Sequence, residues 1–287
     1  MAFALHRLNL EITDVTDTGP QGAGQGDAYS PSQVASRARD LGVTKVRNDT
    51  FSMFALAVLA GAFISLGALL FVVVNTGSAL GFGATRLLAG VGFSLGLILV
   101  VVAGAELFTG NVLTAMAWAS GLVSFREVLR SWVIVYIGNL FGALATVALV
   151  FVGRVHEFGE LGAVAETLRR IAAHKLALHT SQAFALGVLG NALVCLAVWL
   201  TLAARSVTDK VLAVVFPVTA FVAIGFEHSI ANMFLLPWAL TLDGYRLDAI
   251  LGSTWNIVVV TLGNIAGGTL LVAAVYWTIY LRKRGGR

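Results

Sequence analysis

Long charge-free segments dominate the pattern of hydrophobic and polar positions along this chain. A helix that crosses a lipid bilayer needs about 20 consecutive, mainly apolar residues. The pattern therefore predicts an all-α membrane protein rather than a soluble domain. The segments that are long enough to hold one complete spanning helix each are 50–85, 131–153, 180–204 and 249–281.

Two further spans are predicted to be interrupted by ionisable residues. Glu227 and His228 divide one apolar segment without offering the turn residues that a helical hairpin needs, so we interpret it as one discontinuous span. Glu106 divides another segment in the same way. The prediction is six transmembrane helices, of which the second and fifth are broken. The apolar runs beside these residues are 87–105, 107–125, 211–226 and 229–242.

The two halves of the chain resemble each other. A Gly-Asn-x-x-Gly pattern occurs at 138–142 in the third span and again at 263–267 in the sixth. The breaks match as well, with Glu and Asn at the ends of 106–111 and of 227–232. Because three spans are an odd number, the second half enters the membrane from the opposite side, which makes a 3+3 inverted repeat. Broken helices at corresponding positions of such repeats indicate a transport site near the bilayer midplane.

Composition strengthens the membrane prediction and excludes other classes. Hydrophobic residues make up 58% of the chain and charged residues 12%, against roughly 25% in soluble domains. With a mean hydropathy of +0.87, the chain is neither a soluble globular protein, nor disordered, nor a nucleic-acid binder, although its net charge is +4. The single cysteine, Cys195, excludes a disulfide scaffold and a cysteine-based metal site. No cofactor is expected.

An even number of spans places both termini on one side of the membrane. Lys and Arg residues are concentrated on that side, so we expect both termini in the cytoplasm. No signal peptide is expected, because the apolar start at 1–5 is too short. Residues 1–48 are predicted to form a cytoplasmic tail, and 49–287 the six-helix transmembrane domain with a short cytoplasmic C-terminus.

The tail has two predicted parts. Residues 16–33 are rich in Gly, Gln, Ser and Asp, which is typical of a flexible leader. A short amphipathic helix is predicted to follow, with Ser30 as its N-cap, Pro31 in its first turn and Gly42 at its end. This helix is either an anchor at the membrane interface or a lid over a pore mouth.

Glu106, Glu227 and His228 are the titratable acid or base side chains inside the predicted spans. A charge at the centre of a membrane helix costs roughly 2.5–3.5 kcal/mol, so such residues are candidate functional groups. Each glutamate either serves transport or ties down the exposed backbone of its break. His228 is either a buried structural histidine or, as we favour, a pore residue that donates a hydrogen bond to an anion or exchanges a proton with it.

The first break offers further groups for an anion. Thr109 supplies a hydroxyl at the position that we take as equivalent to His228, and Gly110 adds flexibility. A half-helix predicted to start near Asn111 presents free backbone N–H groups and the positive end of its dipole, and the second break repeats this up to Asn232. Neither break has metal-ligand spacing or a nucleophile–base set, so an enzyme is not predicted.

The longest predicted loop, 154–179, is rich in basic residues. It is interpreted either as a solvated amphipathic helix or as a basic vestibule that concentrates anions at the outer mouth. Lys45 is the corresponding candidate on the cytoplasmic side.

Three motifs carry a resemblance to a known family: Phe93-Ser94-Leu95-Gly96-Leu97, Leu107-Phe108-Thr109-Gly110-Asn111 and the run from Gly225-Phe226-Glu227-His228 to Phe234. They resemble the formate/nitrite transporter family, and most closely its bacterial formate channel branch. The resemblance covers about residues 37–282, whereas 1–30 look like an unrelated extension. It implies an aquaporin-like fold that assembles as a homopentamer in the lipid of the bacterial cytoplasmic membrane, with one pore in each subunit. It also implies passage of small monovalent weak-acid anions: formate, nitrite, acetate, lactate and hydrosulfide.

The resemblance also implies roles for single residues by motif position. Phe93 and Phe221 match the outer constriction, Leu97 and Leu107 the inner one, Thr109 the switching loop, His228 the central histidine, Lys175 and Asn191 the outer vestibule and chamber, and Lys45 the cytoplasmic side. From the breaks themselves, Glu227 is also counted in the substrate pathway, and Glu106, Asn111 and Asn232 are expected to support the breaks. The leading prediction is a channel for such anions, in which formate, nitrite and hydrosulfide remain alternatives. A pore for water or small neutral solutes would share the fold but would not need His228, and a purely structural scaffold would leave the two breaks unexplained.

Overall fold

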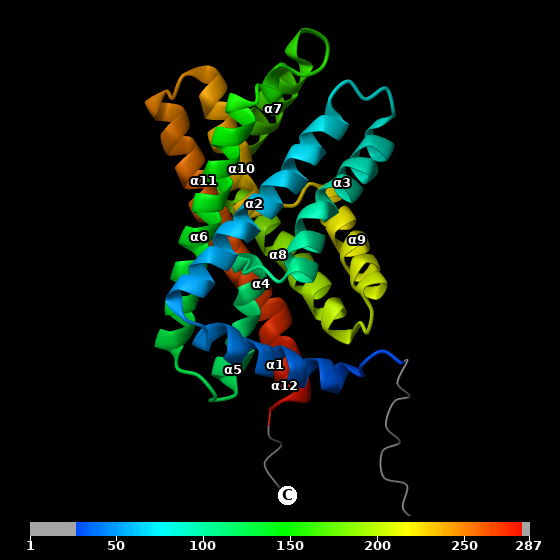
Figure 1. Cartoon of the computed structure of the whole chain (residues 1–287), viewed down its shortest axis with the longest axis vertical. Coiled ribbons are helices and arrows are strands. Elements are labelled where there is room, and N and C mark those ends of the chain that lie inside the picture. Colours follow the sequence, from blue (N-terminus) through cyan, green and yellow to red (C-terminus); the bar gives the residue numbers. More distant parts are fainter. Residues whose placement is uncertain (1–26, 283–287) are drawn as a thin grey trace, which may run out of the picture.

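The computed structural model describes residues 27–282, and every regular element in this range is helical. Figure 1 shows an elongated bundle whose long helices run between two ends, one covered by α1 (Pro31–Arg47) and the other carrying α7 (Ala163–Leu176). Predictions that concern residues 1–26 lie outside the described range. The same holds for part of the basic residues used for the orientation: Arg7, Lys283, Arg284 and Arg287.

Within residues 27–282, six helices have the length and apolar character needed to cross a membrane, as the charge-free segments predicted. The last span is a continuous 34-residue helix, Leu247–Tyr280, in which α11 (Leu247–Ala266) passes through a π-helical segment, Gly267–Ala274, into α12 (Val275–Tyr280). The other five are α2 (Thr50–Asn75), α3 (Phe82–Ala103), α6 (Phe125–Val152), α8 (Thr180–Ala203) and α9 (Val207–Ile224).

The second and fifth spans are broken, as predicted. The second continues after α3 through α4 (Phe108–Asn111), a 3₁₀ turn (Val112–Thr114) and α5 (Ala115–Ala119). The fifth continues after α9 through α10 (Ser229–Asp243). The first half-helix therefore starts at Phe108, and the prediction that it starts near Asn111 was wrong by one turn.

Helix α1 confirms the predicted amphipathic segment but not its end. Ser30 is the N-cap, and its hydroxyl and the Gln33 side chain form a capping box with the first turn. The helix continues through Gly42, because Gly42 packs against Ala117 rather than capping the helix; a Cβ there would lie 3.3 Å from the Ala117 Cβ. Its apolar face, which includes Val34, is buried on the bundle and not turned to lipid.

The predicted loop 154–179 contains a helix. After two 3₁₀ turns, Val155–Glu157 and Glu160–Gly162, α7 follows over Ala163–Leu176. Its buried apolar residues recur at helical spacing on one face, the pattern of an amphipathic helix that packs on a protein surface. Helix α7 contacts α10, α2 and α11, so it covers one end of the broken fifth span.

The Gly-Asn-x-x-Gly patterns bring helices of each half into direct backbone contact. A methyl group on Gly142 would overlap the carbonyl oxygen of Val58, which joins α6 to α2. In the second half, a methyl group on Gly267 would overlap the carbonyl oxygen of Val188, which joins the last span to α8. The equivalent contacts support the predicted internal repeat and leave no room between these helices.

Candidate functional site

Both breaks begin with the same backbone turn. Helix α3 ends at Gly104 and helix α9 at Gly225, each with a positive φ, 82° and 94°, that only glycine adopts without strain. The chain then runs extended to Leu107 in the first break and to His228 in the second, and each of these residues is the N-cap of the following half-helix. Leu107, and not Thr109 as predicted, is therefore the repeat-equivalent of His228.

Two asparagines hold the extended segments in place. Asn139 of α6 accepts the Phe108 N–H at 2.9 Å and donates to the carbonyl oxygens of Ala57 and Glu106 at 2.7 and 2.9 Å. All three side-chain bonds satisfy backbone groups that the interruption exposes. Such groups are costly to leave unpaired inside a membrane.

Asn264 in the last span makes the same three bonds in the second half. It accepts the Ser229 N–H at 2.9 Å and donates to the carbonyl oxygens of Gly187 and Glu227 at 2.8 and 3.1 Å. Sequence reasoning used Asn139 and Asn264 only as part of a packing motif and missed this role. Their recurrence at the same place in both halves is the signal that could have revealed it.

Each break also holds a buried carboxylate with a lysine and an asparagine. Glu106 accepts the Lys45 ammonium at 2.8 Å and the Asn111 amide at 2.6 Å. Lys45 comes from α1, and its ammonium also donates to the Asn111 side-chain oxygen at 3.0 Å. The predicted support of this break by Glu106 and Asn111 therefore includes Lys45 as their counter-charge.

The second carboxylate, Glu227, has equivalent partners. Its two oxygens accept the Lys175 ammonium of α7 at 2.8 and 3.0 Å, and one accepts the Asn232 amide at 2.7 Å. The Asn232 amide also donates to the side-chain oxygen of Asn256 at 2.8 Å. A helix from outside the broken span thus supplies the counter-charge in both halves.

His228 and Thr109 meet between the two breaks. The His228 Nε2 lies 2.9 Å from the Thr109 Oγ1, and its Nδ1 accepts the Ala231 backbone N–H at 3.2 Å. Because Nδ1 accepts a hydrogen bond, the ring proton of a neutral His228 sits on Nε2 and is donated to Thr109. The Thr109 hydroxyl proton then remains available to another acceptor, since the described residues offer it no second partner.

Helix α8 fixes the backbone beside this pair. The Asn191 amide donates to the carbonyl oxygens of Thr109 and Asn264 at 3.1 and 2.6 Å, and the Cys195 thiol lies 3.4 Å from the same Thr109 oxygen. The Asn191 side-chain oxygen is buried and has no hydrogen-bond partner among residues 27–282. It is therefore a free acceptor next to the His228–Thr109 pair.

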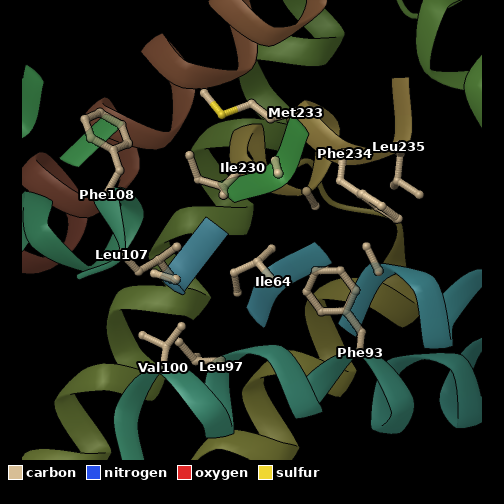
Figure 2. Close-up of a cluster of buried hydrophobic side chains, with 14 of the residues drawn as sticks. Ile64, Phe93, Leu97, Val100, Leu107, Phe108, Ile230, Met233, Phe234 and Leu235 are labelled. Atoms are coloured by element: carbon tan, nitrogen blue, oxygen red, sulfur yellow. The ribbon is translucent and has the colours of Figure 1, made fainter. Parts of the chain in front are cut away.

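Apolar side chains close the space on both sides of the pair. The Phe93 and Phe221 rings pack edge to face with centroids 5.5 Å apart, and Phe221 lies 6.1 Å from the His228 ring. Figure 2 shows Phe93 and Leu97 on α3, with Leu107 nearby on the segment that follows that helix. All four side chains are at most 5% exposed.

Two cavities approach these constrictions from opposite ends. The cavity on the α1 side has a volume of about 600 Å³, and Leu97 and Leu107 are among its lining residues. The cavity on the α7 side has a volume of about 710 Å³, and it reaches Phe93, Phe221 and His228. Both have basic linings: Arg37, Lys45, Arg205 and Lys210 on the α1 side, and Arg86, Arg170, His174 and Lys175 on the α7 side.

Comparison with known proteins decides the family. The family model described as "Formate/nitrite transporter" matches residues 32–278. The chain belongs to the formate/nitrite transporter family. This transporter is 39% identical over 275 residues to "Formate channel FocA" of Escherichia coli, with 90% of this chain and 96% of that protein covered. It is 38% identical over 271 residues to the "Probable formate transporter" of Methanothermobacter thermautotrophicus, with coverages of 88% and 98%.

Solved structures agree with the fold of this transporter. A "Pentameric formate channel with formate bound" matches with a TM-score of 0.73 and 42% identity, covering 81% of this chain and 98% of that one. An "FNT family ion channel" matches with a TM-score of 0.77 and 29% identity, covering 86% and 99%. The six-span, twice-broken architecture is thus shared with solved members of the family.

Hydrogen bonds and the two cavity linings connect the predicted site residues in the transporter. On the α1 side lies the Lys45 cluster above Leu97 and Leu107, and on the α7 side lies the Lys175 cluster above Phe93 and Phe221. The His228–Thr109 pair and Asn191 lie between the two sides.

Proposed function

We propose that this transporter is a channel for formate and related small monovalent weak-acid anions in the bacterial cytoplasmic membrane. The observation that carries the proposal is the buried His228–Thr109 pair between two basic cavities that end at apolar constrictions. The relatives named as formate channels support formate as the substrate. The basic linings favour an anion over the neutral solute of a water-type pore.

Assembly and orientation are part of the proposal. A homopentamer is supported by the pentameric structural relative. The α1 side is assigned to the cytoplasm, together with both termini, because the basic residues of α1 and of the loops at that end outnumber those at the α7 end. In this arrangement α7 and Lys175 face the outside, and α1 with Lys45 covers the cytoplasmic mouth.

The physical obstacle to transport is the pair of apolar constrictions. A charged group that leaves water for apolar surroundings pays a large desolvation cost. A weak acid avoids this cost when it takes up a proton and becomes neutral. Lys175 and its basic neighbours attract the anion into the outer cavity, and burial near Phe93 and Phe221 then favours the neutral acid over the anion.

His228 and Thr109 are placed to handle the proton and the acid in the middle. The free Thr109 hydroxyl proton can be donated to a carboxylate oxygen, and a relay through His228 replaces it in two steps. His228 first takes up a proton from the outer cavity at Nδ1, which breaks the hydrogen bond from the Ala231 N–H. The imidazolium then passes its Nε2 proton to Thr109 and is left neutral, with the proton on Nδ1. Inward flux through this relay moves one proton with each anion. If His228 stays neutral and only donates a hydrogen bond, the anion leaves the cell without a proton.

The test measures formate uptake and internal pH in the same proteoliposomes. Wild type is expected to take up formate and to acidify the lumen, whereas His228→Asn, which keeps an N–H donor but cannot titrate, is expected to lose acidification by at least about tenfold. His174→Asn is the matched control, because His174 lines the same outer cavity but is not hydrogen-bonded to the pair, so this variant should still acidify the lumen. An unchanged internal pH during uptake in both wild type and His228→Asn contradicts the relay. Wild-type uptake no faster than in empty vesicles contradicts the channel itself.

A further inference from the structure

Arg86 forms a contact that the transport pathway described above does not use. Its side chain leaves the first turns of α3 and reaches the last turn of α9, where Nε donates to the carbonyl oxygen of Ala223 at 3.1 Å and Nη2 to that of Val222 at 2.8 Å. These carbonyls belong to the last turn of a helix, where regular intrahelical partners run out, although the Val222 carbonyl also accepts the Gly225 N–H at 3.1 Å. A cation at this end also interacts favourably with the helix dipole.

Phe221 of the constriction directly precedes Val222 and Ala223, the two residues whose carbonyl oxygens accept the Arg86 hydrogen bonds. The partner of Phe221, Phe93, lies seven residues after Arg86, which is two turns along the same face of α3. Between them, α3 and α9 are in backbone contact, since a Cβ on Gly90 would lie 2.8 Å from the Thr219 carbonyl oxygen. On α3, Arg86 and Phe93 lie on either side of this contact, and on α9 their partners all follow Thr219 within four residues, so Arg86 and the ring pair connect the same short stretches of the two helices.

The first half of the repeat lacks this contact, so the fold alone does not require it. With Gly104 matched to Gly225, the residue equivalent to Arg86 is Val207, whose side chain is 60% exposed and has no donor. No side chain among residues 27–282 donates to the end of α3 in the way that Arg86 donates to the end of α9. Only the constriction on the α7 side is braced in this manner.

We propose that Arg86 is the positioning residue of the Phe93–Phe221 constriction: by bridging two carbonyls at the end of α9 to α3, it fixes Phe221 against Phe93 and sets the size of the acid that passes. A planar guanidinium presents two parallel donors to such a pair of acceptors, and an ammonium does not. The two hydrogen bonds of the guanidinium, more than its positive charge, therefore hold Phe221 in position against Phe93. This inference rests on the proposed function only in its choice of substrates.

The first measurement compares uptake of lactate with uptake of formate in proteoliposomes. Arg86→Met and Arg86→Lys are both expected to raise the lactate-to-formate rate ratio, roughly tenfold, because a loosened constriction discriminates less by size. Arg170→Met is the matched control: Arg170 lines the same cavity and its hydrogen bond goes to Thr167 of its own helix α7, so its loss removes a charge without breaking a hydrogen bond to α9. It should slow both acids alike and leave the lactate-to-formate ratio unchanged. An unchanged ratio in Arg86→Met, or a wild-type ratio in Arg86→Lys, overturns the proposal.

A second variant disturbs the bridge from the other side. A Cβ on Gly225 would lie 2.9 Å from the Arg86 Nη2, so Gly225→Ala displaces the guanidinium while Arg86 remains. Because alanine also strains the backbone at a φ of 94°, Gly104→Ala is the control: it imposes the same kind of strain at the first break, where an added Cβ meets nothing within 4 Å. Gly225→Ala is expected to raise the lactate-to-formate ratio more than Gly104→Ala does, and this comparison decides the question if neither Arg86 variant folds. A wild-type ratio in Gly225→Ala overturns the proposal.

Amide hydrogen exchange tests the bridge without any transport. The amides of Gly225 and Phe226 donate to the carbonyls of Phe221 and Val222, so their exchange reports how firmly the end of α9 is held. Arg86→Met and Arg86→Lys should accelerate exchange in a peptide that covers 221–226 but not in one that covers 100–105, and Arg170→Met should change neither. If wild type takes up no formate, the proposed function fails, but the exchange measurement still decides the role of Arg86. Equal exchange of the 221–226 peptide in wild type and in all variants overturns the proposal that Arg86 positions the constriction.

Discussion

Each break confines a carboxylate whose charge is offset by a lysine from a helix outside the broken span. Glu227, only 3% exposed, is paired with Lys175, and Glu106, 7% exposed, is paired with Lys45. Moving an ion out of water costs several kcal/mol even after relaxation, so each pair is stable only because both members are present and hydrogen-bonded. The glutamates are therefore both structural supports and the source of the fixed charge that holds the lysines at the constrictions.

This pairing predicts an asymmetry between the two ways of breaking it. Lys175→Met leaves a buried, uncompensated Glu227 carboxylate and should lower the free energy of unfolding by roughly 3–5 kcal/mol. Glu227→Gln should cost less, because the amide can still bond with Asn232 and the freed ammonium can turn into the cavity. The double variant should recover most of the loss of Lys175→Met. Thermal unfolding in detergent measures all three, and a double variant no more stable than Lys175→Met contradicts the pairing.

The residues of the site were predictable to different degrees. Glu106, Glu227 and His228 stand out because ionisable groups are rare in apolar spans. Their partners were not visible in the same way. Lys45 and Lys175 reach the carboxylates only because α1 and α7 pack over the ends of the bundle, and the pattern along one chain does not specify that packing.

At the scale of helices, charge-free length predicted the spans, and glycine was harder to interpret. Gly42 looked like the end of α1 but lies inside it, since a glycine is equally suited to a helix end and to a close helix contact. Gly104 and Gly225 do end helices, with positive φ. Only the neighbouring backbone distinguishes the two roles, and that information is absent from a local pattern.

The close helix contacts predict which glycines cannot be enlarged. Gly142→Ala and Gly267→Ala would each press a methyl group into a carbonyl of the adjacent helix, and the cost should be about 1–3 kcal/mol or more. Gly83→Ala is the matched control: Gly83 is also helical, but an added Cβ meets nothing within 4 Å, so this variant should be neutral or slightly stabilising. Thermal unfolding midpoints check the comparison. Equal midpoints for Gly142→Ala, Gly267→Ala and Gly83→Ala would mean that the helices are not in backbone contact.

At the scale of the whole molecule, two half-chains form one pathway. The inverted repeat was predictable from the matched breaks, and the amides of Glu106 and Glu227 bear it out by donating to the equivalent carbonyls of Leu56 and Leu186. The differences between the halves were not predictable. The N-cap of the half-helix is an apolar Leu107 in the first half and a titratable His228 in the second. Only the second break therefore places a titratable side chain at this position of the repeat.

This asymmetric pathway predicts selection by acid strength as well as by size. Nitrite and nitrate are both small and monovalent, but nitrite is the anion of a weak acid and nitrate that of a strong acid, so only nitrite can become neutral by taking up a proton at a modest free-energy cost. Crossing the constrictions as an ion would carry an idealised desolvation cost of about 20 kcal/mol, so nitrate should enter proteoliposomes at least tenfold more slowly than nitrite. Acetate separates the two criteria, because it is a weak acid with a methyl group and should still pass faster than nitrate. Nitrite uptake should also rise as the external pH falls, whereas nitrate uptake should not. Nitrate entry as fast as nitrite entry would show that the anion crosses Phe93–Phe221 and Leu97–Leu107 with its charge, and the neutral-acid mechanism would then be wrong.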